Sequence, residues 1–122
     1  MDSIAKLKTW VRENRQRLID ELMAFLSQPS VSTTGLGIEE TVRFLEKELN
    51  RLGFETRILT LGGAYPVVFG EVGDKTAPVS LCIYGHYDVQ DPDPLSEWHS
   101  DPFKPEIRNH KIYALWNVRQ RR

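Results

Sequence analysis

The chain has 122 residues, a formal net charge of −1, and ordinary shares of apolar (40%) and charged (27%) residues. These values predict one small globular domain, and they give no electrostatic basis for binding nucleic acid or an anionic membrane. No apolar run approaches the roughly 20 residues of a membrane span. Because the N-terminus lacks the apolar core of a signal peptide and the single cysteine cannot form an internal disulfide, we expect a cytoplasmic protein.

The first half of the chain is expected to be helical. Apolar side chains recur at helical spacing over residues 3–26, and the polar residues Asn14 and Arg15 interrupt them, so the helix can kink there or leave its middle exposed. A polar loop with two glycines follows over residues 30–37. Residues 38–52 have the pattern of a second amphipathic helix, and Gly53 stands just past it, where glycine adopts the left-handed conformation cheaply.

The second half of the chain changes to strand-like patterns. We predict strands over residues 54–59, 66–72 and 79–84, of which the third is the most apolar and therefore the central one. A short hairpin that turns at Asn109 and His110 follows near the end. Two helices followed by these strands predict an α/β fold, in which the helices pack on part of an incomplete mixed sheet.

A histidine and an aspartate follow the third predicted strand directly. Gly85 ends the apolar run, and ligands in α/β sheets bind just past the carboxyl ends of strands. Residues i and i+2 of an extended segment point to one side, so His86 and Asp88 can face a common space while Tyr87 turns away. Imidazole binds zinc and a carboxylate can orient it, but a zinc site needs three or four ligands. Taken alone, the pair is therefore more often structural than functional.

Other candidate groups have simpler interpretations. His99 and His110 are interpreted as exposed surface histidines, and Cys82 as a small residue in the core of the third strand. Trp98 and Phe103 are interpreted as apolar anchors of a loop. No nucleophile-elbow, phosphate-loop or dinucleotide-binding glycine pattern is present.

The His-x-Asp pair belongs to a longer motif that resembles a known family. Leu-Cys-Ile-Tyr-Gly-His-Tyr-Asp-Val, followed by Trp98, Asp101-Pro-Phe and Lys111-Ile-Tyr, is similar to the N-terminal segment of the zinc metallopeptidases. That family includes carboxypeptidases, dipeptidases, aminoacylases, acetylornithine deacetylase and succinyl-diaminopimelate desuccinylase. By this resemblance residues 1–114 are part of a catalytic domain, and the loop between the motifs is most similar to the dipeptidase branch.

The resemblance implies an activity and roles for two residues. His86 is then the first zinc ligand, and Asp88 is a catalytic-site aspartate that orients a ligand. The family hydrolyses amide bonds with two zinc ions bridged by an aspartate and a water, and a glutamate acts as general base. The implied substrates are small peptides or N-acyl amino acids. Members are often homodimers, through a domain that this sequence lacks.

Residues 115–122 depart from the family pattern. The family continues Gly/Ala-Arg-Gly-x-x-Asp-x-Lys-Gly, and its aspartate bridges the metals, whereas this chain reads Leu-Trp-Asn-Val-Arg-Gln-Arg-Arg. Codons allowed for this tail spell Arg-Gly-Thr-Ser-Asp-Asn-Glu-Gly after the loss of a single base, so we hypothesise a frameshift. Without the bridging aspartate and the later ligands, we expect an inactive N-terminal fragment of the hydrolase.

A second interpretation is a non-catalytic α/β module. Such a module would bind a peptide or protein partner by adding a strand to an open sheet edge, although no sequence feature favours it. Under either interpretation an incomplete sheet exposes apolar faces and an unpaired edge. We therefore expect the isolated chain to be poorly soluble or partly disordered.

Overall fold

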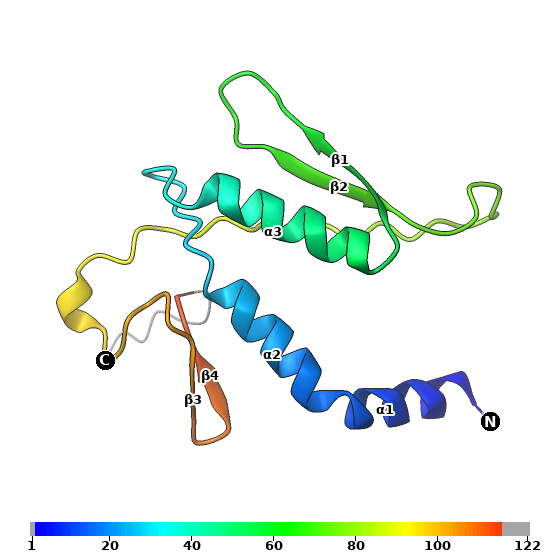
Figure 1. Cartoon of the computed structure of the whole chain (residues 1–122), viewed down its shortest axis with the longest axis horizontal. Coiled ribbons are helices and arrows are strands. Elements are labelled where there is room, and N and C mark those ends of the chain that lie inside the picture. The colour runs from blue at the N-terminus through cyan, green and yellow to red at the C-terminus, as the bar shows by residue number, and fades with distance from the viewer. Residues whose placement is uncertain (1, 116–122) are drawn as a thin grey trace. The chain divides into compact units, whose positions relative to one another are not determined.

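The structure is a computed structural model that describes residues 2–115 (Figure 1). The chain divides into two compact units, one made of Met1–Ser27 with Ser96–Arg122 and the other of Gln28–Leu95. The expected frameshifted tail lies, apart from Leu115, outside the described residues. That expectation therefore stays a hypothesis.

The unit Gln28–Leu95 is built from one helix and one hairpin. Helix α3 (Ile38–Arg51) is followed by strands β1 (Glu55–Leu59) and β2 (Val67–Glu71), which pair antiparallel. Gly53 lies between helix and hairpin with φ +88°, so it has the left-handed conformation expected at a helix end. The predicted second helix and first two strands are therefore confirmed, and none of their ends differs from the prediction by more than one residue.

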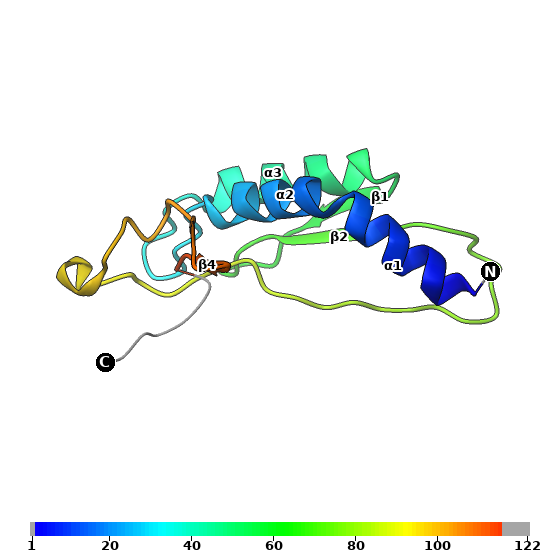
Figure 2. The same cartoon turned by 90° about the horizontal axis from the view of Figure 1, so that it is seen from below.

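Helix α3 packs against the β1–β2 hairpin, as Figures 1 and 2 show. Its first turn is the most buried part, since Ile38 and Val42 are 4% and 7% exposed and Thr41 is fully buried. The Thr41 hydroxyl donates to the Gly37 carbonyl at 2.7 Å, so this buried polar side chain has a hydrogen-bond partner.

An ion-pair cluster lies on the hairpin. Glu71 accepts from Lys75 at 2.9 Å and from Arg57 at 2.7 Å, and Lys75 also contacts Glu55 at 3.2 Å. The hydrogen bonds from Lys75 and then Arg57 lower the pKa of the Glu71 carboxyl, and the bond to Glu71 raises the pKa of Lys75. Glu55, Arg57 and Lys75 are solvent-exposed and Glu71 is partly exposed, so salt screens the cluster.

The third predicted strand does not form in this structure. Residues 79–84 belong to no strand (Figure 2). The side chains of Leu81, Ile83 and Tyr84 are 86%, 86% and 90% exposed. Cys82 is exposed as well, so its predicted place in the core is wrong. The physical reason is the lack of a neighbour: β1 and β2 pair with each other, and no ladder within residues 2–115 reaches this segment. A strand without a partner cannot satisfy its backbone groups in a sheet.

The other unit begins with two helices. Helices α1 (Ser3–Glu13) and α2 (Arg15–Leu26) are separated at Asn14, whose side-chain amide donates to the Trp10 carbonyl at 2.8 Å. The single helix predicted over residues 3–26 is thus broken at the polar residue where a kink was expected. No described helix is long and apolar enough to cross a bilayer.

A short hairpin completes this unit. Strands β3 (Glu106–Arg108) and β4 (Lys111–Tyr113) pair antiparallel, and one 3-10 turn, η1 (Leu95–Glu97), precedes them in the chain. Asn109 and His110 have φ of 50° and 61°, which is the backbone that a two-residue type I′ turn requires. The predicted hairpin is therefore confirmed.

Candidate functional site

A backbone bridge anchors the segment that carries His86 and Asp88. Val31 and Val89 form an isolated parallel bridge, and both side chains are buried. The Val89 N–H donates to the Ser30 carbonyl at 2.8 Å, and the Ser32 N–H donates to the Val89 carbonyl at 3.0 Å. The loop that precedes α3 therefore fixes the backbone on the C-terminal side of Asp88.

Hydroxyl groups add a second layer of anchoring. Ser30 Oγ donates to the Tyr87 carbonyl at 2.6 Å, and Ser32 Oγ donates to the Val89 carbonyl at 3.1 Å. The Tyr87 hydroxyl donates to the Pro66 carbonyl at 2.7 Å. Burial, with the nearby Asp88 carboxylate, raises the pKa of the Tyr87 hydroxyl. Tyr87 thus turns into the unit, away from the solvent that its two neighbours face.

His86 and Asp88 come together on the exposed side of this segment. His86 Nδ1 lies 2.9 Å from the Asp88 carbonyl oxygen and 3.3 Å from Asp88 Oδ1. Both oxygens only accept, so a hydrogen bond to either of them requires a proton on Nδ1, and in a neutral imidazole that leaves Nε2 unprotonated. This tautomer is the one in which a histidine coordinates a metal through Nε2 while an oxygen orients its ring. The expected shared direction of the two side chains is confirmed.

The donor set around His86 is smaller than the zinc site that the resemblance implies. Residues 2–115 contain no group of three or more His, Cys, Asp and Glu side chains that could hold a metal, and the sequence of residues 116–122 contains none of these four types. Because zinc takes at least three protein ligands, His86 and Asp88 fit as one ligand and its orienting carboxylate. They do not make a complete centre. His99 and His110 are exposed, as predicted.

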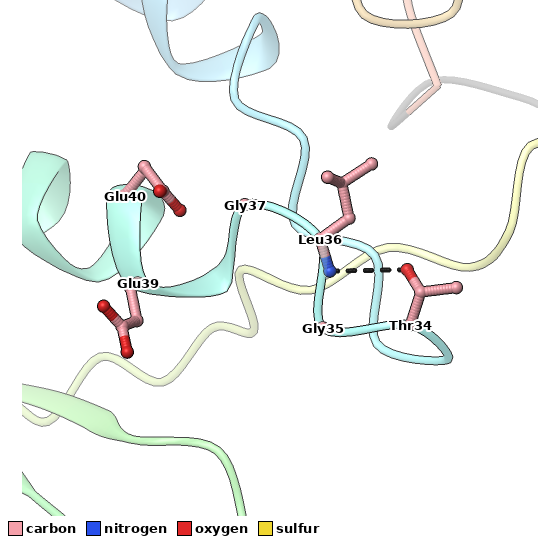
Figure 3. Close-up of a pocket in the computed structure, with 6 residues that line it drawn as sticks. All are labelled: Thr34, Gly35, Leu36, Gly37, Glu39 and Glu40. Carbon is pink, nitrogen blue, oxygen red and sulfur yellow. Dashed lines mark hydrogen bonds between the residues drawn. The ribbon is translucent and has the colours of Figure 1, made fainter.

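A shallow hollow lies beside the anchoring loop (Figure 3). It is lined by residues from the loop and from the first turn of α3, namely Thr34, Gly35, Leu36, Gly37, Glu39 and Glu40. The Leu36 N–H donates to Thr34 Oγ1 at 3.3 Å, which closes the turn at one end of the hollow. Its polar side chains are one threonine and two glutamates, with no histidine, cysteine, lysine or arginine among them, so we assign this hollow no function.

Sequence reasoning missed the anchoring residues. Ser30 and Ser32 lie in the stretch Pro-Ser-Val-Ser, and Tyr87 lies between the two candidate site residues. Their partners lie 57 residues away for the serines and 21 for the tyrosine. No local spacing could reveal pairs this far apart.

Comparison with known proteins identifies relatives of the chain. No family model matches it. Succinyl-diaminopimelate desuccinylase of Xylella fastidiosa (strain M23) is 34% identical over 97 residues, which cover 80% of this chain and 24% of that protein. A protein of the same name from Wolbachia pipientis is 40% identical over 66 residues, or 54% of this chain and 16% of the relative.

A solved structure has the same fold as much of the chain. The crystal structure of an M20 family metallo-carboxypeptidase from Sulfolobus solfataricus matches with a TM-score of 0.73 and 42% identity, over 79% of this chain and 22% of that one. The fold therefore matches part of a metallopeptidase domain.

More specifically, the chain belongs to the M20 family, and it spans less than a quarter of the length of the relatives described here. The predicted resemblance and fold class are confirmed by these relatives. The dipeptidase branch stays a prediction, because the relatives are desuccinylases and a carboxypeptidase.

Proposed function

We propose that this chain is a segment of a metal-dependent amide hydrolase in which His86 is a zinc ligand and Asp88 orients it. The observation that carries the proposal is the contact of His86 Nδ1 with both the carbonyl and the carboxylate of Asp88. Bound zinc would polarise the scissile carbonyl and activate a water. This chain's own contribution is to hold the His86 ring in the metal-binding tautomer.

The proposed substrates follow from the relatives. Their names describe removal of a succinyl group from diaminopimelate and cleavage at a peptide carboxyl end. Both reactions hydrolyse an amide bond in a small molecule or peptide. We therefore propose an N-acyl amino acid or a small peptide, including a dipeptide, as the substrate of a whole protein that contains this segment.

The 122-residue chain is proposed to be inactive by itself. Its candidate centre has one imidazole, His86, and one carboxylate, Asp88, which is fewer than the three donors that zinc requires. Purified chain supplied with zinc should release no amine from N-succinyl amino acids or dipeptides. Measurable, metal-dependent release would contradict this part of the proposal.

Metal binding tests the role of His86 directly. A zinc titration of the full chain should show weak binding. His86→Ala should lower the association constant at least about tenfold, because loss of a residue that only orients a ligand already lowers metal affinity about tenfold or more, and loss of the ligand itself should lower it at least as much. His99→Ala is the matched control, since it removes an exposed histidine of the same chain. Equal affinities for His86→Ala and the unsubstituted chain would show that His86 is not a ligand.

A second candidate function is binding of a peptide or protein by strand addition. The observation that favours it is the uncharged, exposed segment 79–84, which has no ladder partner in the described part of the chain. An extended apolar peptide would hydrogen-bond to such a segment. Peptide binding that survives chelation of zinc and is lost in Leu81→Lys would support this function. Equal binding by Leu81→Lys would argue against it.

A further inference from the structure

We propose that Ser30 is the positioning residue for the His86–Asp88 pair. Ser30 is 1% exposed, and it bonds to this segment twice. Its hydroxyl donates to the Tyr87 carbonyl at 2.6 Å, and its carbonyl accepts from the Val89 N–H at 2.8 Å. The inference rests on the proposed function, because it explains how the proposed metal ligand is oriented.

The carbonyl of Ser30 acts on the peptide that joins Asp88 to Val89. In a planar trans peptide the N–H and the C=O point in opposite directions. Because the Val89 N–H faces Ser30, the Asp88 carbonyl faces away from it. His86 Nδ1 lies 2.9 Å from that carbonyl oxygen. Ser30 therefore sets the direction of the acceptor that holds the imidazole.

The hydroxyl of Ser30 acts on the preceding peptide. It binds the Tyr87 carbonyl, which belongs to the peptide that joins Tyr87 to Asp88. Both peptides that flank Asp88 are thus held by one buried residue. With both planes fixed, the Asp88 carbonyl and carboxylate stay together around His86 Nδ1.

Ser32 provides a matched comparison on the same two segments. Its hydroxyl and its N–H both donate to the Val89 carbonyl, at 3.1 and 3.0 Å. The Val89 carbonyl belongs to the peptide that joins Val89 to Gln90, which does not flank Asp88. It still accepts from the Ser32 N–H when the Ser32 hydroxyl is removed. Loss of the Ser32 hydroxyl should therefore leave the His86 ring as it is.

The experiment measures the tautomer of His86 by long-range nitrogen–proton NMR on the full chain, without metal and at pH 8.5, about two units above the ordinary pKa of an imidazole in water. Threonine and valine have nearly the same shape and differ in the hydroxyl. In the unsubstituted chain and in Ser30→Thr, the Nδ1–H form of His86 should be the major species. In Ser30→Val it should become the minor species. Ser32→Ala should match the unsubstituted chain, and His99 is an internal reference.

Several outcomes would overturn the inference. Equal His86 tautomer populations in Ser30→Thr and Ser30→Val would show that the hydroxyl does not position the ring. A shift as large in Ser32→Ala would show a general effect of loop stability. Unfolding of Ser30→Val with a folded Ser30→Thr would assign the hydroxyl to fold stability instead. Because this readout uses no metal, it stands apart from the zinc titration, and either result can fail without the other.

Discussion

Replacing Gly37 with alanine should damage the loop that anchors the candidate site. Gly37 precedes α3 with φ +72°, and a β-carbon built there would lie 1.6 Å from the Pro29 carbonyl oxygen and 2.7 Å from the Pro29 carbonyl carbon. These are backbone atoms, so no side-chain rotation can relieve the contact. Pro29 directly precedes Ser30, so the displaced backbone is the one that holds Tyr87 and Val89.

The magnitude has two parts. The left-handed backbone costs a non-glycine residue about 1–2 kcal/mol, and forced repacking around an inserted methyl group costs about 1–3 kcal/mol. We therefore expect Gly37→Ala to lower the free energy of unfolding by about 2–5 kcal/mol. Gly53 is the matched control, because it has φ +88° and nothing within 4 Å of its added β-carbon. Gly53→Ala should cost only the backbone part, about 1–2 kcal/mol.

Urea unfolding followed by circular dichroism at the helix band measures both changes. The difference between the two variants isolates the contact with Pro29, since both share the effect of alanine on the unfolded chain. The His86 tautomer in Gly37→Ala gives a second readout. If Gly37→Ala is no less stable than Gly53→Ala, the close approach of Gly37 to Pro29 does not exist in solution and the reasoning fails.

Three further predictions concern other parts of the same unit. Because hydrogen bonds lower the folded-state pKa of Glu71, its contribution to stability is present above the ordinary glutamate pKa and is lost as the pH falls through the lowered value. Glu71→Gln should therefore flatten the acid side of the stability curve. Leu81→Lys should reduce the binding of a dye that reports exposed apolar surface, and it should reduce self-association measured by analytical sedimentation, because Leu81 is 86% exposed. Tyr87→Phe should cost about 0.5–1.5 kcal/mol in urea unfolding, through loss of the bond to Pro66.

Each of these predictions has a control in the same chain. Glu40→Gln changes an exposed carboxylate on α3 and should leave the acid slope as it is, so equal slopes for both variants would contradict the role of the ion-pair cluster. Leu61→Lys, in a turn and 74% exposed, should change self-association less than Leu81→Lys. Tyr84→Phe, at 90% exposure, should stay within about 0.5 kcal/mol of the unsubstituted chain. If Tyr84→Phe lowers the free energy of unfolding as much as Tyr87→Phe does, the effect of Tyr87→Phe does not come from its hydrogen bond to Pro66.

Local pattern predicted much of the fold. The stripe of α3, the alternation of β1 and β2 and the turn at Asn109 and His110 each depend on a few neighbouring residues. Their formation needs only contacts close in sequence, so periodicity and turn chemistry suffice. The break at Asn14 follows the same logic, because it interrupts an apolar stripe.

The strand expected over residues 79–84 failed for a different reason. Its apolar run describes a segment that is buried when neighbours exist on both sides, and a sequence pattern cannot supply those neighbours. In the described part of the chain Leu81, Ile83 and Tyr84 face solvent. The apolar residue types favour burial of residues 79–84, but the segment stays exposed because no strand of the described part of the chain pairs with it.

The sequence by itself determined most of the elements, the family resemblance and the choice of His86 and Asp88 as candidates, because motif and periodicity are local properties of the chain. Only the tertiary structure showed that Nδ1 of His86 meets both oxygens of Asp88 and that Ser30 holds the peptides around them. Ser30 and Tyr87 are 57 residues apart, and a hydrogen bond requires a separation near 3 Å with a particular direction. Distance and direction of that kind come from the folded chain.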